Sequence, residues 1–301
     1  MDSHGATADA VRRATSVVGI GTPLSITQLP VGMSNAVFDV ALVGGGRVVA
    51  RVSSVAKNRY AMETRVMERV RLAGIPCPEI YGVQEVGDLA VMLIEYLPGV
   101  RLAEAQEGPN LAGTCGEMLA RVHSIGVTGV GNLASSGNGE SDSLDRWFVD
   151  EFEPSLARAA TAGDDRVRRT VEQVRSEFES ARPALRAASC GLVHGDYSPS
   201  NILVHGGQIS GVIDWESAKG GPAAFDFGWW DWFEAAFSVP FTCNELIAAY
   251  GAHRAVDVDE LREMRRLVVM RILIGQVAWA ASRDQRPELQ VALRRLEEVG
   301  P

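Results

Sequence analysis

The chain has 301 residues, of which 46% are hydrophobic and 22% are charged. This length allows one large domain or two average ones with a substantial core, and the composition excludes a disordered tail, a collagen and a disulfide miniprotein. The 29 basic and 38 acidic residues give a net charge of −9, which argues against binding to a nucleic-acid backbone.

The negative charge is confined to residues 101–301, which hold 20 basic and 29 acidic residues, whereas residues 1–100 hold nine of each. This imbalance favours a cationic ligand for the second region, although acidic surfaces also serve solubility alone. Charge alone does not decide between a cationic ligand and solubility.

Four cysteines are widely spaced and form no C-x-x-C pair: Cys77, Cys115, Cys190 and Cys243. We expect reduced thiols and a cytoplasmic protein. The start of the sequence lacks the basic and apolar regions of a signal peptide. The most apolar stretch, 267–281, is interrupted by Arg271 and Gln276 and predicts a buried helix instead of a membrane span. We expect a monomer with no membrane or nucleic-acid partner.

Residues 1–98 are predicted to form a small β-rich domain. Apolar periodicity predicts helices over residues 8–18 and 58–73, and alternation between Gly-rich turns predicts five strands. The strands are expected at residues 24–29, 37–42, 48–52, 80–86 and 89–94.

Residues 99–301 are predicted to form a larger helical domain that begins after the boundary segment 95–99. Helices are expected at residues 111–124, 144–160, 165–187 and from 246 to the end. One strand pair, 202–204 and 209–213, interrupts the helices. The Gly/Ser/Asn-rich segment 126–143 predicts a mobile loop.

The most informative segment runs from residue 192 to residue 216. Asp196 and Asn201 lie directly before the predicted hairpin, and Asp214 lies directly after it. Because a short hairpin returns the chain close to its start, we expect these three side chains to meet. Carboxylate and amide oxygens suit Mg²⁺ with bound phosphates, and a neighbouring carboxylate can take a proton from a hydroxyl nucleophile. Ordinary turn chemistry is the simpler alternative.

The pattern H-G-D-x-x-x-x-N, followed by a hairpin and I-D-W-E, resembles the aminoglycoside phosphotransferase (antibiotic kinase) family. The resemblance covers about residues 24–281. It implies an α+β, bilobal protein-kinase-like fold with a small β-rich N-lobe and a larger helical C-lobe. The segments 45–47, 59–60, 75–79 and 270–276 further resemble hygromycin B phosphotransferases, and macrolide phosphotransferases share many of these features.

The resemblance implies a Mg²⁺-dependent O-phosphotransferase that uses ATP or GTP. Asp196 matches the catalytic aspartate, which orients the acceptor hydroxyl and acts as its base. His194 matches the loop histidine that shapes this segment. Asn201 and Asp214 match the Mg²⁺ ligands.

Several N-terminal residues match the family's nucleotide-binding positions. Arg51 takes the strand position that is lysine in protein kinases, and Glu63 is its expected partner. Lys57, in the loop after the strand, is the rival phosphate contact. The phosphate-covering loop and the adenine-binding linker are matched by Gly32, Ser34, Asn35, Glu95, Tyr96 and Leu97.

Asp226-Phe227-Gly228 is literally D-F-G, but it does not follow the hairpin. Asp226 matches instead a buried aspartate that braces the catalytic loop, so we predict a structural role for it. The aromatic side chains of segment 226–237 predict one core-facing stripe. Carboxylates beside aromatic surface suit a polyhydroxylated amine, and the candidate acceptor-binding residues are Glu216, Asp231, Glu234, Trp147 and Asp150.

The favoured acceptor is an aminoglycoside or aminocyclitol antibiotic such as hygromycin B, whose phosphorylation confers resistance. The alternatives are a macrolide or nucleoside antibiotic, or a metabolite such as choline, homoserine or a sugar. The presence of Asp196, Asn201 and Asp214 argues against a pseudokinase. A Rossmann-type enzyme is opposed because Gly19-Ile20-Gly21 lacks a preceding strand and a third glycine.

Overall fold

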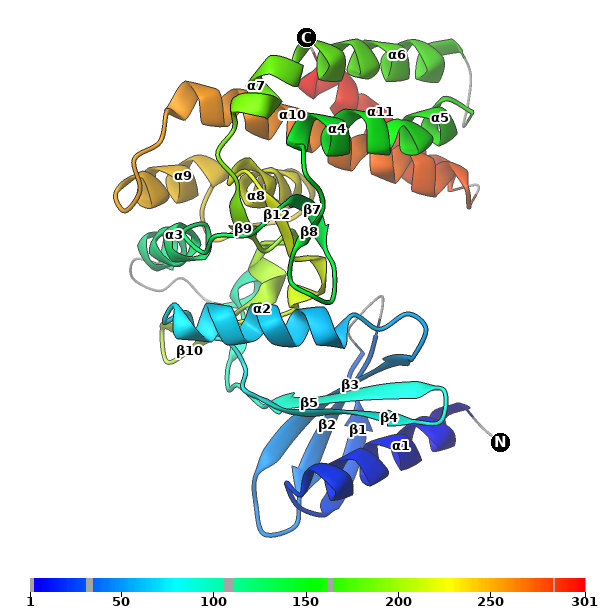
Figure 1. The fold of residues 1–301 in the computed structure, drawn as a ribbon, viewed down its shortest axis with the longest axis vertical. Coiled ribbons are helices and arrows are strands. Elements are labelled where there is room, and N and C mark those ends of the chain that lie inside the picture. The colour runs from blue at the N-terminus through cyan, green and yellow to red at the C-terminus, as the bar shows by residue number, and fades with distance from the viewer. Residues whose placement is uncertain (1–2, 31–34, 106–110, 162–164, 284, 301) are drawn as a thin grey trace. The chain divides into compact units, whose positions relative to one another are not determined.

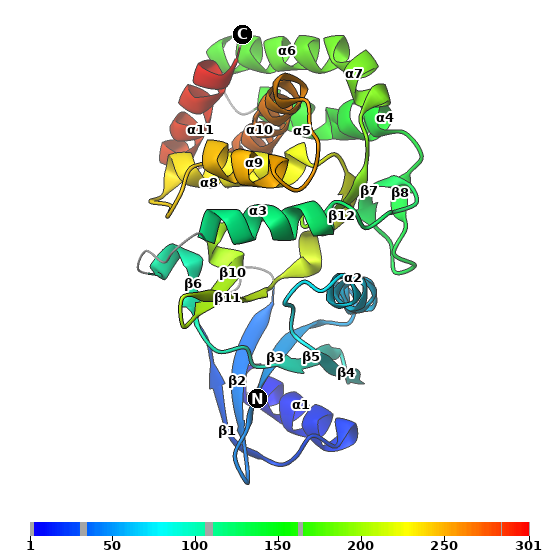
Figure 2. The ribbon, with the colours of Figure 1, turned by 90° about the vertical axis from the view of Figure 1, so that its left-hand side faces the viewer.

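The computed structural model describes residues 3–30, 35–105, 111–161, 165–283 and 285–300. The chain divides into two compact units: residues 1–100 with 202–216, and residues 101–201 with 217–301 (Figures 1 and 2). We call them the strand unit and the helical unit. Within the described ranges, no helix combines the length and apolar character that a membrane span needs.

The strand unit is built on a five-stranded antiparallel sheet with the order β1-β2-β3-β5-β4. The predicted strands and helices of residues 1–100 are confirmed, with α1 extended toward the N-terminus. Their bounds are α1 (Ser3–Val18), β1 (Pro23–Gln28), β2 (Ala36–Leu42), β3 (Arg47–Ser54), α2 (Tyr60–Leu72), β4 (Ile80–Val86) and β5 (Leu89–Glu95).

The two helices of this unit lie on opposite faces of the sheet (Figure 1). Ala10, Val11 and Ala14 of α1 pack against alternate residues of β3, including Ala50 and Val52. Because successive strand residues point to opposite faces, Arg51 is directed to the face that carries α2. This alternation places a charged side chain beneath the helix that supplies its partner.

The predicted hairpin is confirmed as β10 (Ile202–His205) and β11 (Gln208–Val212). Ile202 pairs with Val212, and a register shift lies between Leu203 and Val204. The Val212 N–H donates to the Pro76 carbonyl over 2.8 Å, which anchors the hairpin within the strand unit.

The helical unit follows β6 (Val100–Arg101), at the boundary. Two long helices predicted from periodicity are each broken in two, because Pro154 and Pro183 sit at the first turns of new helices. The predicted C-terminal run is three helices. The bounds are α3 (Leu111–Val122), α4 (Leu144–Val149), α5 (Glu153–Ala160), α6 (Asp165–Ser180), α7 (Arg182–Ala187), α8 (Ala224–Ala236), α9 (Cys243–Gly251), α10 (Val258–Ala281) and α11 (Arg286–Val299).

The helical unit also contains a small sheet with the order β8-β7-β12-β9. The prediction of a mobile loop over residues 126–143 is therefore wrong in part, because this segment supplies two of the strands. They are only three or four residues long and glycine-rich, so they show no clear alternation. Their bounds are β7 (Val130–Leu133), β8 (Gly139–Ser141), β9 (Gly191–Val193) and β12 (Lys219–Gly221).

The aromatic stripe predicted on α8 is only partly a core feature. Trp230 is fully buried and stacks on Phe241 at 4.7 Å between ring centroids, but Trp229 is half-buried and Phe237 is 55% exposed. The helix ends at Ala236, so Phe237 leaves the buried face.

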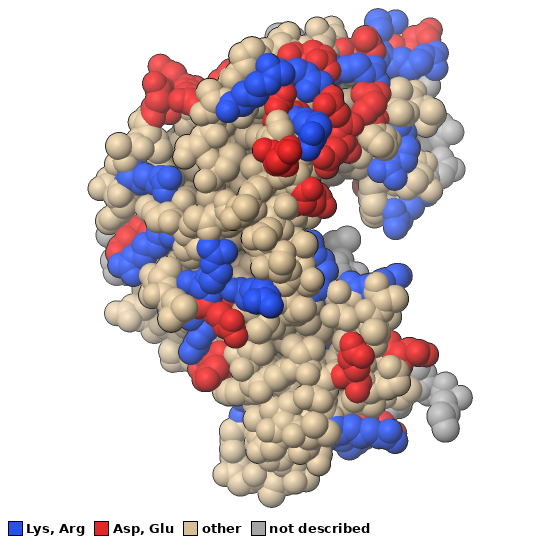
Figure 3. Space-filling view, in the orientation of Figure 1, with Lys and Arg blue, Asp and Glu red and all other residues tan. Residues whose placement is uncertain are grey.

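Acidic and basic side chains are mixed on the surface of the helical unit around α6 and α7, so this surface is not uniformly negative (Figure 3).

All four thiols are free, as predicted. Cys77, Cys115 and Cys243 are buried, and burial raises the pKa of each to about 12. They are therefore protonated and unreactive at neutral pH.

Candidate functional site

Asp214 follows the hairpin in an unusual backbone conformation. Its φ is 66°, the only positive value among the described non-glycine residues. Such a conformation costs about 1–3 kcal/mol and is concentrated at functional sites. Its side chain is 39% exposed, so a carboxylate is held at the surface of the strand unit by strained backbone.

Arg51 is the centre of an ion-pair cluster in the strand unit. Its side chain is 9% exposed and pairs with Glu63 of α2, as the sequence predicts. The same guanidinium donates to Asp214 Oδ1 over 3.0 Å and to Glu216 Oε2 over 3.1 Å. Burial alone would lower the pKa of Arg51, but the carboxylates outweigh burial and raise it. The guanidinium is therefore charged at any physiological pH.

Glu216 lies with the residues assigned to the nucleotide, although the sequence suggests it for the acceptor. Its Oε2 accepts from Asn35 Nδ2 over 2.6 Å, and its backbone carbonyl accepts from Arg59 over 2.9 Å. Asn35 Oδ1 also accepts from the Tyr60 hydroxyl over 3.4 Å. The structure thus brings Asn35 to the Arg51 cluster. Two other loop residues of the prediction, Gly32 and Ser34, lie outside the described residues.

The charges of this cluster do not balance. One guanidinium faces three carboxylates, those of Glu63, Asp214 and Glu216. Burial is the largest influence on Glu63 and raises its pKa, while Arg51 acts in the opposite direction. With all groups ionised, the net charge is −2, and the partly exposed oxygens of Asp214 and Glu216 are the ones that a cation can reach.

Removing the Arg51 charge is expected to destabilise the strand unit. Arg51→Ala leaves Glu63 buried without a partner, and we expect it to lower the free energy of unfolding by about 3–5 kcal/mol. Arg51→Lys retains the charge but not the planar fork and costs less. Urea denaturation measures both. Lys57 is exposed in a turn, so Lys57→Ala is the matched control and is expected to change stability by less than about 0.5 kcal/mol. Equal losses for Arg51→Ala and Lys57→Ala would contradict this account.

The linker residues lie at the end of β5. The Glu95 N–H donates to the Glu79 carbonyl over 2.8 Å, and the Glu95 carboxylate accepts from the Glu79 N–H over 3.0 Å. The Tyr96 ring is covered by the guanidinium of Arg47, 3.7 Å from its centroid. The side chain of Leu97 packs against Gly211 of the hairpin. The Glu95 N–H is thus used within the sheet.

In the helical unit, Asp196 and Asn201 lie in one loop and contact each other. Asn201 Nδ2 donates to the backbone carbonyl and to Oδ2 of Asp196, both over 2.9 Å. This double contact fixes the amide, and the Asn201 Oδ1 accepts no hydrogen bond from the described residues. His194 is fully buried, and its Nδ1 lies 3.3 Å from the Asp196 N–H. The buried His194 ring therefore supports the backbone of this loop.

Asp226 braces this loop, which confirms the structural role predicted for it. It is fully buried at the start of α8, and its two carboxylate oxygens accept from the His194 N–H over 2.9 Å and the Gly195 N–H over 2.8 Å. His123 Nε2 is 3.0 Å from Asp226 Oδ2. No sequence signal identified His123, because it lies directly after α3 and 103 residues before Asp226.

Gly195 is required by the same arrangement. Its φ is 79°, and a Cβ there would lie 2.1 Å from the Ser217 carbonyl oxygen. Only glycine fits this left-handed and crowded position. The strand β9, the glycine turn and the Asp226 carboxylate together fix the backbone that leads to Asp196.

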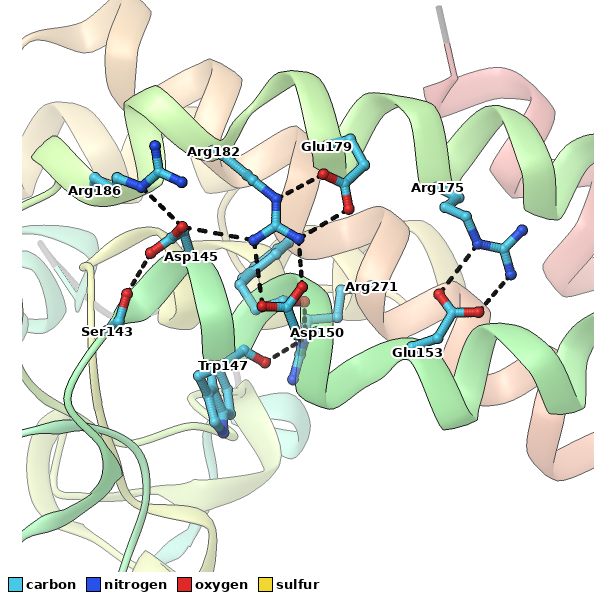
Figure 4. Close-up of polar contacts among 11 residues, drawn as sticks. Ser143, Asp145, Trp147, Asp150, Glu153, Arg175, Glu179, Arg182, Arg186 and Arg271 are labelled. Carbon is cyan, nitrogen blue, oxygen red and sulfur yellow. Dashed lines mark hydrogen bonds and ion pairs between the residues drawn. The ribbon is translucent and has the colours of Figure 1, made fainter.

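The carboxylates suggested for acceptor binding have protein partners. Asp150 is exposed and pairs with Arg182, which also contacts Glu179 (Figure 4). Asp231 lies 3.3 Å from Arg265 Nε, and Glu234 accepts from the Cys243 N–H over 2.6 Å. Trp147, by contrast, lines a cavity of about 440 Å³ in the helical unit. Three of the suggested acceptor carboxylates are thus engaged with other residues of the helical unit, and their role in acceptor binding stays a prediction.

Comparison with known proteins places the chain in a family. Residues 25–265 match the phosphotransferase enzyme family (APH). Hygromycin-B 4-O-kinase of Escherichia coli is 26% identical over 221 residues, which cover 69% of this chain and 63% of that protein. Homoserine kinase of Gluconobacter oxydans is 26% identical over 217 residues, covering 69% and 65%. The alignments thus span slightly less than two thirds of these relatives.

A solved structure supports the same fold. A thermostable mutant of aminoglycoside phosphotransferase APH(4)-Ia, in a ternary complex with ADP and hygromycin B, superposes with a TM-score of 0.78 at 20% identity. The match covers 96% of this chain and 97% of that one. With a sheet-based strand unit, a helical unit and a family match over four fifths of its length, the chain belongs to the phosphotransferase enzyme family and has the kinase-like α+β fold predicted from its sequence.

Proposed function

We propose that this protein transfers the γ-phosphate of ATP or GTP to a hydroxyl group of a small-molecule antibiotic, with Mg²⁺ as the cofactor. The observation that carries the proposal is the Asp196 carboxylate, held by Asn201 Nδ2 over 2.9 Å in a loop that the buried Asp226 braces. Holding a carboxylate in one place is what positioning of a hydroxyl nucleophile requires.

In this proposal Asp196 accepts the proton of the acceptor hydroxyl. The hydroxyl oxygen forms a bond to the γ-phosphorus, the bond between that phosphorus and the β–γ bridging oxygen breaks, and the nucleoside diphosphate leaves. Arg51 stands where the family resemblance places a phosphate contact, and Glu63 holds its guanidinium in position. The Arg51 guanidinium would thereby present a fixed positive charge to the phosphates, and bound Mg²⁺ would offset the net negative charge that the three carboxylates give the cluster.

The residues present fit Mg²⁺. Asn201 retains an amide oxygen without a hydrogen-bond donor among the described residues, and Asp214 presents a partly exposed carboxylate. Mg²⁺ prefers such oxygen ligands and keeps several waters and phosphate oxygens in its coordination shell. No cluster of three His, Cys, Asp or Glu side chains suited to a metal occurs in the described part of the chain. We therefore assign Asn201 and Asp214 to a metal that the nucleotide helps to hold, which neutralises phosphate charge when bound.

Asp214→Ala tests this assignment. The variant is expected to weaken the binding of Mg²⁺-AMP-PNP by about tenfold or more, since a charged ligand is lost. Binding of AMP-PNP without Mg²⁺ should change less, because the metal is not involved. Calorimetric titration with and without Mg²⁺ measures the difference. Equal weakening under both conditions would assign Asp214 to Arg51 alone.

The acceptor is tested with a panel of hydroxylated compounds. The similarity to hygromycin-B 4-O-kinase makes hygromycin B one candidate, and six of the compared relatives are homoserine kinases, which makes homoserine the metabolic alternative. The purified chain is incubated with Mg²⁺ and ATP or GTP and with an aminoglycoside, hygromycin B, a macrolide, a nucleoside antibiotic or homoserine. Mass spectrometry then reads the mass of each acceptor.

A gain of one phosphate by one antibiotic class, with equimolar nucleoside diphosphate, is the expected result. Phosphorylation of homoserine alone would support phosphate transfer but overturn the antibiotic assignment. Nucleotide binding with no phosphorylated acceptor would contradict the proposal as a whole.

A further inference from the structure

A second cavity of the helical unit, of about 250 Å³, lies among residues that are not assigned to the nucleotide, the metal or the acceptor. Its wall is formed by the starts of α8 and α10, by the connection between α9 and α10, and by the place where β9 begins and β12 ends. The volume is just below the range of about 300–1,000 Å³ that is usual for drug-sized ligands. We therefore expect a small ligand.

The inner wall of this cavity belongs to the network that braces the Asp196 loop. His123 and Tyr250 line the cavity and are buried. His123 Nδ1 lies 3.2 Å from the Tyr250 hydroxyl, and His123 Nε2 lies 3.0 Å from Asp226 Oδ2. Burial raises the pKa of Tyr250 to about 12, although the positive charge of Arg254 acts against this rise. A ligand in the cavity would thus contact the partners of Asp226, with the Arg254 charge close by.

Three charged side chains line the cavity: Arg254, Asp257 and Glu260. Within the described part of the chain, none of them has an oppositely charged group within ion-pair distance. Arg254 Nη1 donates to Ser124 Oγ over 3.2 Å, and Asp257 Oδ1 accepts from the backbone N–H groups of Asp259 and Glu260 over 3.0 Å each. These partner groups are neutral, so all three charges remain. The cavity thus brings one positive and two negative charges together without pairing them.

The opposite charges are close enough for one compact molecule to bridge them. Arg254 and Asp257 are three residues apart, so their Cα atoms are separated by at most about 11 Å. Met264 follows Glu260 at i, i+4 and therefore lies on the same side of α10. Met264 and Leu261 are buried and line the cavity. Apolar surface therefore adjoins the charged groups.

Each class of small ligand meets these charges differently. A simple anion would pair with Arg254 but would face the carboxylates of Asp257 and Glu260. A simple amine would pair with a carboxylate but would cover the Arg254 charge without neutralising it, and covering an unpaired charge is costly. A zwitterion brings a group of each sign and meets both requirements.

From this arrangement we infer that the cavity binds an α-amino acid with a short aliphatic side chain. The ligand carboxylate would pair with Arg254, and its ammonium group would pair with Asp257 or Glu260. Its side chain would pack against Leu261 and Met264. The inference goes beyond phosphate transfer and does not depend on it, because the residues that line this cavity are not those assigned to that reaction.

The test titrates the full chain by isothermal calorimetry with L-leucine and with two analogues that each lack one charge. The first analogue, 4-methylpentanoate, lacks the ammonium group, and the second, 3-methylbutylamine, lacks the carboxylate. We expect L-leucine to bind about tenfold tighter or more than either analogue, because only L-leucine pairs with both signs of charge. Absence of L-leucine binding, or equal or tighter binding of either analogue, would overturn the inference.

Two variants assign each charge of the ligand to its partner. Arg254→Met keeps a long unbranched side chain and is expected to weaken L-leucine binding about tenfold or more without weakening that of 3-methylbutylamine. Glu260→Gln is expected to weaken L-leucine about fivefold without weakening 4-methylpentanoate. Urea denaturation checks that both variants remain folded.

The matched control is Arg262→Met on the same helix. Arg262 pairs with Asp259 over 3.0 Å and does not line the cavity, so this variant is expected to leave the L-leucine affinity unchanged. If Arg254→Met weakens L-leucine binding no more than Arg262→Met does, the ligand binds elsewhere and the inference is wrong.

The ring nitrogens of His123 give a second readout that is independent of activity. We expect saturation with L-leucine to shift the ¹⁵N resonances of the His123 ring in nuclear magnetic resonance spectra, because this ring lines the cavity. His205 is exposed on the hairpin of the strand unit and serves as the internal control without a shift. An unchanged His123 ring with L-leucine bound would place the ligand outside the cavity and overturn the inference.

Discussion

Replacing Asp196 with alanine is expected to lower the rate of phosphate transfer about 10²–10⁴-fold, the contribution of a positioned general base. Nucleotide affinity is expected to change less than about threefold, because the proposal assigns Asp196 to the acceptor and not to the phosphates. The measurement combines steady-state kinetics of nucleoside diphosphate release with calorimetric titration of Mg²⁺-AMP-PNP.

The matched control is Asp196→Asn. Its amide oxygen can still accept from Asn201 Nδ2, so the loop contact seen at 2.9 Å is retained while the base is lost. Both variants should therefore be nearly inactive, and Asp196→Asn should keep more of the wild-type stability to urea than Asp196→Ala. Substantial activity in Asp196→Asn would show that Asp196 only shapes the loop, and the catalytic assignment would be abandoned.

Asp226→Ala is expected to produce the largest loss of stability in the helical unit. The substitution leaves the N–H groups of His194 and Gly195 without their acceptor and His123 Nε2 without its partner, and all three groups are buried. Breaking a buried charged network of this kind costs about 3–5 kcal/mol. Activity should fall with it, because these hydrogen bonds fix the backbone leading to Asp196.

Asp231→Asn, on the same helix, is the control. Asp231 is partly exposed and lies 3.3 Å from Arg265, so we expect a loss below about 1 kcal/mol. Urea denaturation followed by circular dichroism measures both variants. If Asp226→Ala also lowers the free energy of unfolding by less than about 1 kcal/mol, water or a local rearrangement must accept the hydrogen bonds of the loop N–H groups, and the account is contradicted.

The pH dependence of stability gives a second test of Asp226. Burial alone would raise the pKa of this carboxyl, but the hydrogen bonds from His123 and from the loop N–H groups outweigh burial and lower it. A lowered folded-state pKa stabilises the fold above the unfolded value of about 3.9 and loses that contribution as pH falls below it. Wild-type stability should therefore drop below about pH 4 more steeply than that of Asp226→Asn. Parallel profiles would contradict this.

The strand unit was predictable because its strands are separated by glycine turns and alternate in polarity. The helix starts and short strands of the helical unit were less predictable. Pro154 and Pro183 mark helix starts within longer periodic runs, and β8 and β12 are three-residue strands in glycine-rich sequence. Pairing partners far along the chain, and not local preference, make these short strands.

The candidate site was predictable in its residue types but not in their pairings. The bracing role of Asp226 followed from the family resemblance, whereas the contacts of Glu216 with Arg51 and Asn35 did not follow from the sequence. The proposed roles of Asp196, Asn201 and Asp214 stay predictions. A signal for the cavity of about 440 Å³ was present in the sequence, because Arg271 and Gln276 interrupt an otherwise apolar helix, and both line it.

The carboxylates around Trp147 show that counting charges along the sequence does not reveal which of them are already paired. From the sequence alone, Asp150 and Glu153 indicate an acidic surface that an amine can reach. Their arginine partners lie 32 and 22 residues further along the chain, on other helices. Only the packing of α6 and α7 against this segment reveals that the charges are already neutralised (Figure 4).

Transfer of phosphate from a nucleotide to a small-molecule hydroxyl is tested most directly by ³¹P nuclear magnetic resonance. The wild-type chain is incubated with Mg²⁺, ATP and in turn erythromycin, hygromycin B and homoserine, with Asp196→Ala in parallel. The account predicts a new phosphomonoester signal that grows with ADP for one acceptor and is absent with the variant. Persistence of the ATP γ-phosphate signal with every acceptor, or release of inorganic phosphate alone, would contradict it.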